Sequence, residues 1–387
     1  MTSLLIVVVL ILVSIAIWQL TKIFDLTQIG ADVDNSQIAN DNDNKVNGYL
    51  MFAFLVFIYL ATIFCVVKYG DLPLMSNSAS EHGVEVDRLM WISMIIIFIV
   101  QTITQGLLHY FAYKYRGKKE RKALYFADSN KLEMIWSIIP AITLAGLILY
   151  GLYAWTNIMF VDEETENPLI VEIYAKQFGW EVRYAGEDNV LGKANVRYIE
   201  GINTLGVDVA DPNAQDDIQA NELHLPKGRK VLFKIRSQDV LHSAYMPHFR
   251  AQMNCVPGMV TQFAFIPTQT TEEIRETDEI KSKVENINKL RVEKSKELAT
   301  KGEEALEPYT FDYLLLCNKI CGASHYNMQM KIVVSEPNEF NAWLKDKKTF
   351  GEVIKAQQES EKPVEIPVEE IQPTIADSTA LALLLKK

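Results

Sequence analysis

Four stretches of the 387-residue chain contain no charged side chain, and this feature constrains the fold more than any other. A helix needs about 20 apolar residues to cross a bilayer, and each stretch is long enough. The stretches are Met1–Thr21, Val46–Val67, Leu89–Tyr113 and Met134–Val161. A cleaved signal peptide is the alternative for the first, but that stretch lacks a basic region and a small-x-small cleavage site. We therefore expect four transmembrane helices, the first of them retained.

Charges in the connecting segments orient these helices. Lys114–Glu133 carries seven basic and three acidic residues, so the positive-inside rule places it in the cytoplasm. Lys68–Arg88, with two basic and four acidic residues, fits the outer side. Lys22–Lys45 must then be cytoplasmic despite its five Asp and two Lys, because acidic residues count little in this rule. The chain after Val161 is therefore expected outside the cytoplasm.

After Pro168 the pattern changes to short runs that favour β-branched and aromatic residues. Turn signals such as Pro226-Lys227-Gly228 separate these runs. The expected strands are Leu169–Tyr174, Glu181–Tyr184, Lys230–Ser237, Met259–Ile266, Tyr313–Leu316 and Met328–Val334. Several short strands at this spacing predict an all-β sandwich or small barrel.

Two segments interrupt the strand pattern, and a third follows it. Gly186–Gln219, with its Asp and Asn residues, is expected to be an irregular insertion. Thr271–Glu307 is dense in Glu and Lys, contains no proline and has apolar residues at helical spacing, so we expect one or two exposed helices there. From Gly351 the chain is a low-complexity run of Glu, Pro, Gln and Lys, expected to be disordered or to lie across a partner.

Composition argues against two classes of function. The chain has 38 Lys+Arg against 49 Asp+Glu, and a net charge of −11 is unsuited to neutralising phosphates, so no nucleic acid is expected as a partner. Four cysteines are too few for a disulfide scaffold. No Cys-x-x-Cys-His motif occurs, so we expect no covalent c-type haem in this chain.

One cluster of donor side chains stands out near the end of the β region. It reads Cys317-Asn-Lys-Ile-Cys321-Gly-Ala-Ser-His325-Tyr-Asn-Met328. Thiolate and imidazole ligands together select copper or zinc, and the thioether favours copper. A second imidazole is available at His242.

Four kinds of site compete for these donors. A disulfide between Cys317 and Cys321 leaves His325 and Met328 unexplained, and a zinc site has no use for the thioether. A mononuclear blue-copper site takes only one cysteine. A binuclear copper site with two bridging thiolates uses every donor, with one histidine on each copper and with Met328 and a backbone carbonyl as weak axial ligands. The donor set favours this last interpretation.

Several motifs, taken in order, resemble subunit II of haem–copper cytochrome c oxidases, the subunit that carries the CuA centre. They are Glu133-Met-Ile-Trp136-Ser-Ile-Ile-Pro140, Gln177-Phe-Gly-Trp180, Asp239-Val-Leu-His242-Ser, Phe249-Arg250, Val256-Pro257-Gly258 and the cysteine loop. The resemblance extends from about Leu89 to Ser335, apart from the two insertions.

The resemblance implies a membrane-anchored chain in which transmembrane helices precede a cupredoxin-like Greek-key barrel with a helical insertion. Residues 1–68 would form an extra pair of helices and residues 89–161 the hairpin of the family. Residues 165–345 would form the CuA domain, with insertions at about 186–219 and 271–307, and residues 346–387 an acidic, proline-containing tail. The implied location is the inner membrane of a bacterium, crossed several times, with the CuA domain on the periplasmic side.

The resemblance also implies ligands, partners and an activity. The side chains of His242, Cys317, Cys321, His325 and Met328 and the carbonyl of Lys319 would bind two copper ions. Electrons from a c-type cytochrome, or from a cytochrome-bearing complex in a supercomplex, would reach this centre and pass to haem a in subunit I. Subunit I would reduce oxygen and pump protons.

Glu133 has two interpretations. By itself it is an acid at a helix start, which the helix dipole favours. In the family a carboxylate at this place lies at the mouth of a proton pathway, and the resemblance implies that role.

Three departures from the family pattern affect these expectations. Lys319 replaces a glutamate whose side chain reaches a magnesium site shared with subunit I, and a protonated lysine cannot ligate a metal. Asn254 replaces an aspartate on the same face. Phe178 replaces the tryptophan that receives electrons, which leaves Trp180 as the candidate for that role. The extra helices, the second insertion and the tail are candidate contacts for further subunits.

Overall fold

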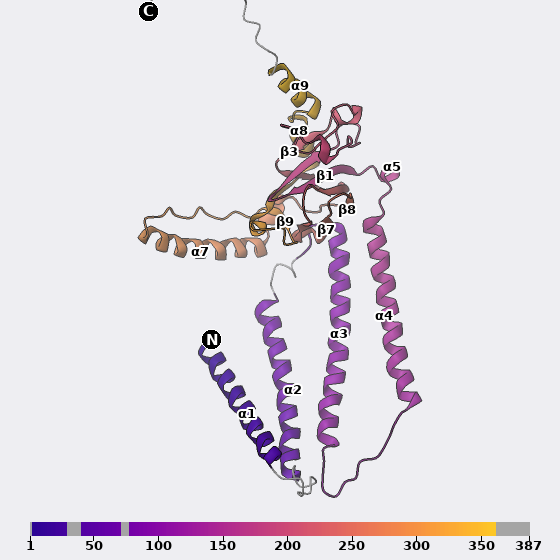
Figure 1. Cartoon of the computed structure of the whole chain (residues 1–387), viewed down its shortest axis with the longest axis vertical. Helices are drawn as coiled ribbons and strands as arrows, with labels where there is room; N and C mark the ends of the chain where they lie inside the picture. Colours follow the sequence, from indigo (N-terminus) through magenta and orange to yellow (C-terminus); the bar gives the residue numbers. More distant parts are fainter. Residues whose placement is uncertain (1, 29–39, 71–76, 361–387) are drawn as a thin grey trace, which may run out of the picture.

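The computed structural model describes residues 2–28, 40–70 and 77–360. Four helices lie on one side of a β domain (Figure 1). They are α1 (Thr2–Gln28), α2 (Asp41–Tyr69), α3 (Glu81–Lys114) and α4 (Asn130–Met159). The last three are long and apolar enough to cross a membrane, whereas the described side chains of α1 form a shorter apolar helix over Val8–Ile23. The predicted membrane anchor is confirmed, and the count of four spans is approximate.

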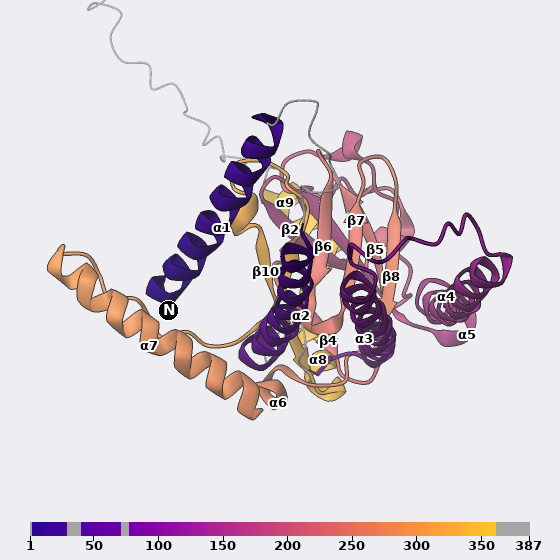
Figure 2. The same cartoon turned by 90° about the horizontal axis from the view of Figure 1, so that it is seen from below.

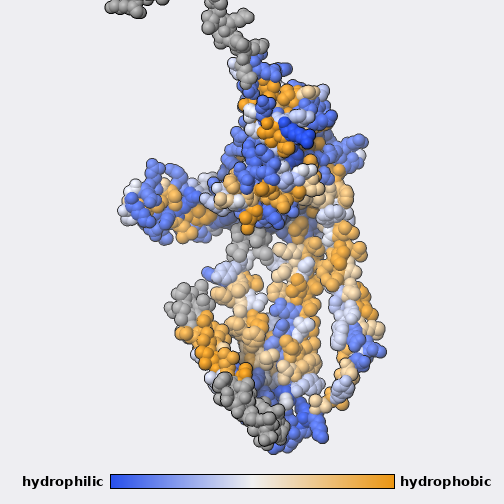
Figure 3. All heavy atoms as spheres, viewed as in Figure 1, coloured by the Kyte–Doolittle hydropathy of each residue, from blue (hydrophilic) through white to orange (hydrophobic). Residues whose placement is uncertain are grey.

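Each long helix begins at a polar cap that accepts a backbone hydrogen bond. Asn40 caps α2, Ser80 caps α3 and Ser129 caps α4. Beyond the caps the helices expose large apolar side chains, which form the orange patches along the helices in Figure 3. Such a surface fits lipid, where apolar side chains need no protein cover.

The start of α2 lies beside the basic segment between α3 and α4. The Asp41 Oδ1 atom accepts a hydrogen bond of 2.9 Å from the Lys119 N–H, and the Asn44 side chain donates to the Gly117 carbonyl at 3.2 Å. The start of α2 and the basic segment therefore lie at the same end of the helices. Their location in the cytoplasm stays a prediction.

The β domain consists of two five-stranded sheets with the orders β3-β2-β1-β5-β8 and β4-β10-β9-β6-β7. The bounds are β1 (Leu169–Lys176), β2 (Gly179–Tyr184), β3 (Ile218–Ala220), β4 (Leu223–Pro226), β5 (Val231–Ser237), β6 (His242–Met246), β7 (Ala251–Cys255), β8 (Thr261–Phe265), β9 (Tyr313–Cys317) and β10 (Gln329–Ser335). The pairs β1–β5 and β4–β10 are parallel and the others antiparallel. Parallel neighbours require crossover connections, so the domain is a Greek-key barrel rather than a meander.

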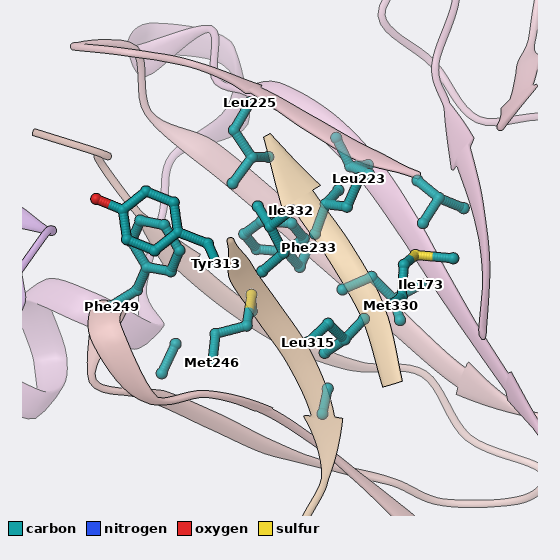
Figure 4. Packing of buried hydrophobic residues seen from close by; sticks show 14 of the residues in the cluster. Ile173, Leu223, Leu225, Phe233, Met246, Phe249, Tyr313, Leu315, Met330 and Ile332 are labelled. Atoms are coloured by element: carbon teal, nitrogen blue, oxygen red, sulfur yellow. The ribbon is translucent and has the colours of Figure 1, made fainter. Parts of the chain in front are cut away.

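The two sheets enclose one hydrophobic core. Figure 4 shows Ile173 and Phe233 of the first sheet facing Leu223, Leu315 and Ile332 of the second. All six expected strands occur within two residues of their predicted ends, and the predicted all-β barrel is confirmed. The short strands β3, β4, β6 and β7 complete the sheets and are additional to that expectation.

The chain over 186–219 folds back over the outer face of the first sheet. It contains the short 3-10 helices η3 (Val196–Tyr198) and η4 (Pro212–Ala214) and packs Leu205 and Val207 against Tyr174. Helix α9 (Phe350–Ser360) joins this small core through Phe350, whose backbone N–H donates to the Asp217 carbonyl at 2.7 Å. The first part of the expected disordered tail is therefore helical, because burial of Phe350 fixes it to the domain. The rest of that expected tail lies outside the described residues.

Helices α6 (Thr271–Arg275) and α7 (Asp278–Thr300) fall in the expected helical insertion. Helix α7 projects from the domain, roughly perpendicular to the transmembrane helices (Figures 1 and 2). The chain returns along α7, where the Asn288 side chain donates to the Tyr309 carbonyl at 3.1 Å and accepts from the Tyr309 N–H at 2.7 Å. The remaining helices are α5 (Glu163–Glu166), α8 (Pro337–Lys345), η5 (Pro247–Phe249) and η6 (His325–Asn327).

The outer end of α3 is fixed to the β domain. The Ala79 N–H donates to the His248 carbonyl at 2.8 Å, and the Ser80 hydroxyl donates to the Phe249 carbonyl at 2.7 Å. About two turns further along α3, Asp87 accepts two hydrogen bonds from the Arg250 guanidinium, at 2.8 and 3.0 Å. These bonds hold the domain in a defined position relative to α3.

His248 at this junction makes stability depend on pH. Burial, together with the charges of Lys283 and Arg250, lowers the pKa of His248 to about 4. An unfolded histidine has a pKa of about 6.5. The neutral buried ring therefore lowers the free energy of unfolding as the pH falls from about 6.5 to about 4, by at most about 3 kcal/mol in total. We expect His248→Gln to reduce this loss, measured as the unfolding midpoint of the detergent-solubilised chain at about pH 7.5 and about pH 5. Equal pH dependence of the two proteins would contradict the assignment.

Candidate metal centre

Strand pairing brings together the two parts of the candidate site. Strand β6 begins at His242 and β9 ends at Cys317, and the two strands pair with Ala244 opposite Cys317. After β9 the chain forms a loop, and the Cys317 N–H donates to the Met328 carbonyl at 3.1 Å where β10 is about to start. This bond closes the loop that carries Cys321 and His325. Residues 75 positions apart in the sequence are thus side by side.

The donor atoms form one continuous cluster around the two cysteines. The Cys317 Sγ atom lies 3.8 Å from His242 Nδ1, 3.9 Å from Cys321 Sγ and 3.2 Å from the Lys319 carbonyl oxygen. The Cys321 Sγ atom lies 3.6 Å from His325 Nδ1 and 3.8 Å from Met328 Sδ. Each cysteine therefore has one histidine and one weaker donor beside it.

The chemistry of this cluster fits a pair of soft metal ions. All four cysteines of the chain are free, and the two sulfur atoms in the cluster are much further apart than the roughly 2.05 Å of a disulfide bond. The ligand atoms of His242, Cys317 and Cys321 all lie within 4.8 Å of one another. Thiolate, imidazole and thioether donors prefer copper, so the side chains present fit this metal.

Hydrogen bonds orient the His242 ring. Its Nε2 atom lies 2.8 Å from Asp239 Oδ1, so Nε2–H donates to the carboxylate and Nδ1 is left as the metal-binding atom. Burial alone raises the pKa of Asp239, but hydrogen bonds from His242 and from the Gln177 and Val240 N–H groups outweigh it and lower that pKa. Asp239 is therefore a carboxylate at neutral pH and holds the ring in one tautomer.

Gln177 links the Asp239 carboxylate to the cysteine loop. Its backbone N–H donates to Asp239 Oδ2 at 2.8 Å, and its side-chain amide donates to the Cys321 carbonyl. Burial and the neighbouring Cys317 raise the pKa of the Cys321 thiol to about 11. The metal-free cysteine is therefore protonated at neutral pH, and a bound metal would displace this proton.

Two aromatic residues lie next to the cluster. Trp180 is only 6% exposed, and the centre of its ring is 6.3 Å from that of His242. Phe178 is 40% exposed and packs over Gly322, where a Cβ atom would lie 2.8 Å from the phenyl ring. Gly322 has a φ of +141°, a backbone conformation that favours glycine. The contact with Phe178 also leaves no room for a larger side chain at this position. Trp180 is thus the interior aromatic and Phe178 the surface one.

The structure separates the other predicted site residues from the cluster. Glu133 lies exposed in the first turn of α4, a helix of 30 residues that is about 45 Å long, at the end away from the β domain. The Lys319 side chain is exposed, and only the carbonyl of this residue faces the cluster. Asn254, on β7, is also exposed.

Asp239 and Gln177 are functional candidates that the motif analysis quoted without assigning a role. A carboxylate three residues before a histidine ligand is the signal that could have identified Asp239, since metal-binding histidines usually donate their second N–H to such a group. Nothing local to Gln177 points to Cys321, because 144 residues separate them.

Asp239→Asn tests the orientation of His242. The amide removes the negative charge that holds the ring, so copper affinity of the full-length protein should fall by about 10- to 100-fold. Competitive titration against a copper chelator measures this change. Asp346→Asn, at the exposed residue that ends α8, serves as the control. An unchanged affinity in Asp239→Asn would show that the carboxylate does not support the metal.

Comparison with known proteins identifies the family. The family model for the transmembrane domain of cytochrome c oxidase subunit II matches residues 68–154, and that for its periplasmic domain matches residues 169–282. The alternative cytochrome c oxidase subunit 2 of Bradyrhizobium diazoefficiens is 32% identical over 268 residues, which cover 69% of this chain and 81% of that protein. Cytochrome c oxidase subunit 2 of Alkalihalophilus pseudofirmus is 22% identical over 262 residues, covering 66% of this chain and 56% of that protein.

The solved structures include the periplasmic domain of subunit II of the Bradyrhizobium japonicum cytochrome oxidase. It is 20% identical, with a TM-score of 0.26, and the match covers 46% of this chain and 91% of that domain. The second family match contains His242 and ends before the cysteine loop. Because both family models match and the Bradyrhizobium diazoefficiens subunit is 32% identical, the chain belongs to the cytochrome c oxidase subunit II family and is a membrane-anchored oxidase subunit with a periplasmic domain.

Proposed function

We propose that this subunit accepts electrons from a c-type cytochrome at a binuclear CuA centre and passes them to haem a in subunit I, where oxygen is reduced and protons are pumped. The observation that carries the proposal is the convergence of six donors, with two thiols between two imidazoles. Bound copper would supply one-electron storage. The protein would hold both ions in a fixed ligand set, which limits the rearrangement that each electron transfer requires.

Each residue of the cluster has a distinct role in this proposal. Cys317, Cys321, His242 and His325 would hold the two ions. Met328 and the Lys319 carbonyl would be the weaker donors, because a thioether and a neutral carbonyl bind less strongly than a thiolate or an imidazole. Asp239 and Gln177 position His242 and the Cys321 backbone without touching the metal.

Two other functions fit part of this arrangement. A quinol oxidase subunit would keep the fold without the copper ligands, and all five side-chain ligands are present here. A membrane-tethered copper-handling protein would use the cluster alone. Such a protein would require neither the sequence Gln177–Trp180 beside the cluster nor the hydrogen bonds that fix the domain to α3. The electron-transfer function accounts for both features.

The location and partners follow from the same proposal. The chain crosses the inner membrane of a bacterium several times, with residues 89–161 as the hairpin against subunit I and residues 165–345 as the copper domain. The pair of helices within 1–68, the insertion at about 271–307 and the tail of 346–387 contact further subunits. Acidic residues on the periplasmic domain steer a basic cytochrome, or a cytochrome-bearing complex, toward the centre.

Glu133 and Lys319 bear on the contact with subunit I. Glu133 lies in the first turn of α4, and in this proposal it admits protons to a pathway in subunit I. Lys319 does not fit a shared magnesium ion, because its exposed side chain offers an ammonium rather than an oxygen donor. We therefore assign no step to magnesium.

Substitution of either bridging cysteine tests the copper assignment. Cys317→Ser and Cys321→Ser each remove a soft donor shared by both ions, so the content should fall from about two coppers per chain to one or none. Donor-driven oxygen uptake should be lost. Cys65→Ser, an exposed cysteine on α2 outside the cluster, is the matched control. Two coppers and full turnover in either cluster variant would contradict the proposal.

Trp180→Phe tests the electron path. Trp180 is the aromatic ring next to His242, so its loss should slow copper reduction by the donor several-fold while copper content stays the same. Stopped-flow reduction followed at the copper absorption measures the rate. Phe178→Leu changes the exposed neighbouring aromatic residue. Comparison of the two variants separates an effect on docking of the donor from an effect on electron transfer. An unchanged rate in Trp180→Phe would remove this residue from the path.

A further inference from the structure

The end of the barrel that holds the metal cluster presents an apolar surface. Four connections between strands meet there: 177–178, 238–241, 256–260 and 318–328. Each connection exposes at least one large apolar side chain, and together these are Phe178, Val240, Leu241, Met259, Val260, Ile320 and Tyr326. Ile320 and Tyr326, in the cysteine loop, are 86% and 88% exposed. An apolar surface of this kind marks a contact with another protein.

This surface contains one cation without a counter-ion from its own chain. Apart from histidine, the charged residues of the four connections are Asp239 and Lys319. Asp239 is engaged, because it accepts hydrogen bonds from the His242 ring and from two backbone N–H groups. Lys319 is exposed, and its ammonium has no hydrogen bond or ion pair to any residue within 2–28, 40–70 or 77–360.

The backbone on both sides of Lys319 is held in place. The Asn318 N–H donates to the Ser243 carbonyl at 3.0 Å, and the Cys321 carbonyl accepts from the Gln177 side chain. The Lys319 carbonyl oxygen lies 3.2 Å from the Cys317 sulfur, whereas the Lys319 side chain is exposed. The ammonium therefore extends from a fixed point beside the metal cluster into the protein that covers this surface.

The sheet that leads into Lys319 is the one nearer to the membrane. Strands β7 and β9 of this sheet lie next to the outer end of α3, whereas β1 and β3 of the other sheet lie further from the helices (Figure 1). The segment that follows β6 is bonded to the start of α3, where the Ser80 hydroxyl donates to the Phe249 carbonyl. A subunit embedded in the membrane is therefore the partner that reaches this side of the surface.

The residues present here do not fit the magnesium ion that the family resemblance implies at this place. Mg²⁺ takes oxygen ligands, above all carboxylates, but Lys319 offers an ammonium and Asn254 carries no charge. Within the described chain, the one group of His, Cys, Asp or Glu side chains arranged to hold a metal is His242, Cys317 and Cys321. An ammonium would also repel a second cation.

We propose that Lys319 takes the place of this ion, with its ammonium paired to a carboxylate side chain of subunit I in the contact between the two subunits. The inference rests on the proposed function, because it requires subunit I as the partner. A glutamate with a divalent cation presents a single net positive charge to the partner, and a lysine presents the same charge without a metal. Among apolar side chains an ammonium needs an anion beside it, and such a pair fixes the register of the contact.

Restoring the acidic residues tests the replacement of the metal. The oxidase complex is purified from cells grown with Mn²⁺, treated with a chelator and fully reduced, so that copper gives no paramagnetic signal. Electron paramagnetic resonance should detect no Mn²⁺ in the wild type. The double variant Lys319→Glu, Asn254→Asp should retain about one Mn²⁺ per complex, because the carboxylates of both subunits then surround the site. Lys348→Glu, at an exposed lysine between α8 and α9, is the matched control and should retain none.

Removal of the ammonium tests the ion pair. Lys319→Met keeps the carbonyl and most of the side-chain length, so copper content should stay the same. Release of this subunit from tagged subunit I, followed by native mass spectrometry on dilution, should show an apparent dissociation constant raised at least about 30-fold. Lys319→Arg should keep most of the affinity, and Lys348→Met should keep all of it.

Three results would overturn the inference: Mn²⁺ in the wild type, no Mn²⁺ in the double variant, or unchanged affinity in Lys319→Met. All three concern a complex that contains subunit I and the binuclear copper centre, so they leave the proposed function intact. A wild-type complex without subunit I or without that centre would instead contradict the proposed function.

Discussion

The pairing of β6 with β9 is the interaction on which the candidate metal centre depends. It places Ala244 opposite Cys317 and thereby brings His242 to the sulfur atom of a cysteine 75 residues away. The cysteine loop supplies the other donors locally, between the end of β9 and the start of β10. A barrel core of buried apolar residues holds β6, β9 and β10, and so fixes His242 and both ends of the cysteine loop.

The second constraint is the attachment of the β domain to α3. The Ser80–Phe249 and Asp87–Arg250 bonds fix the domain at one height above the membrane. The proposed transfer of electrons to a haem in the membrane requires a constant distance, and these bonds would provide it.

The membrane segments and the cysteine loop could be predicted from the sequence because each is encoded locally. Lack of charge over about 20 residues defines a span, and twelve consecutive residues contain five of the six donors. The strands β6 and β7 could not be predicted this way, since His-Ser-Ala-Tyr-Met and Ala-Gln-Met-Asn-Cys contain no β-branched residue. Pairing with neighbouring strands, rather than local preference, makes them β structure. The same holds for α9, which depends on burial of Phe350, and for Gln177, whose partner is distant in sequence.

The central claim is that Cys317 and Cys321, with His242 and His325, would hold two copper ions as one electronic unit. The most direct test is electron paramagnetic resonance of the full-length protein loaded with copper. The sample is held in the mixed-valence state, which has one electron more than two Cu(II) ions. The account predicts a hyperfine pattern from one unpaired electron shared equally between two copper nuclei. A pattern from a single copper nucleus, or a silent sample with zinc in its place, would contradict it.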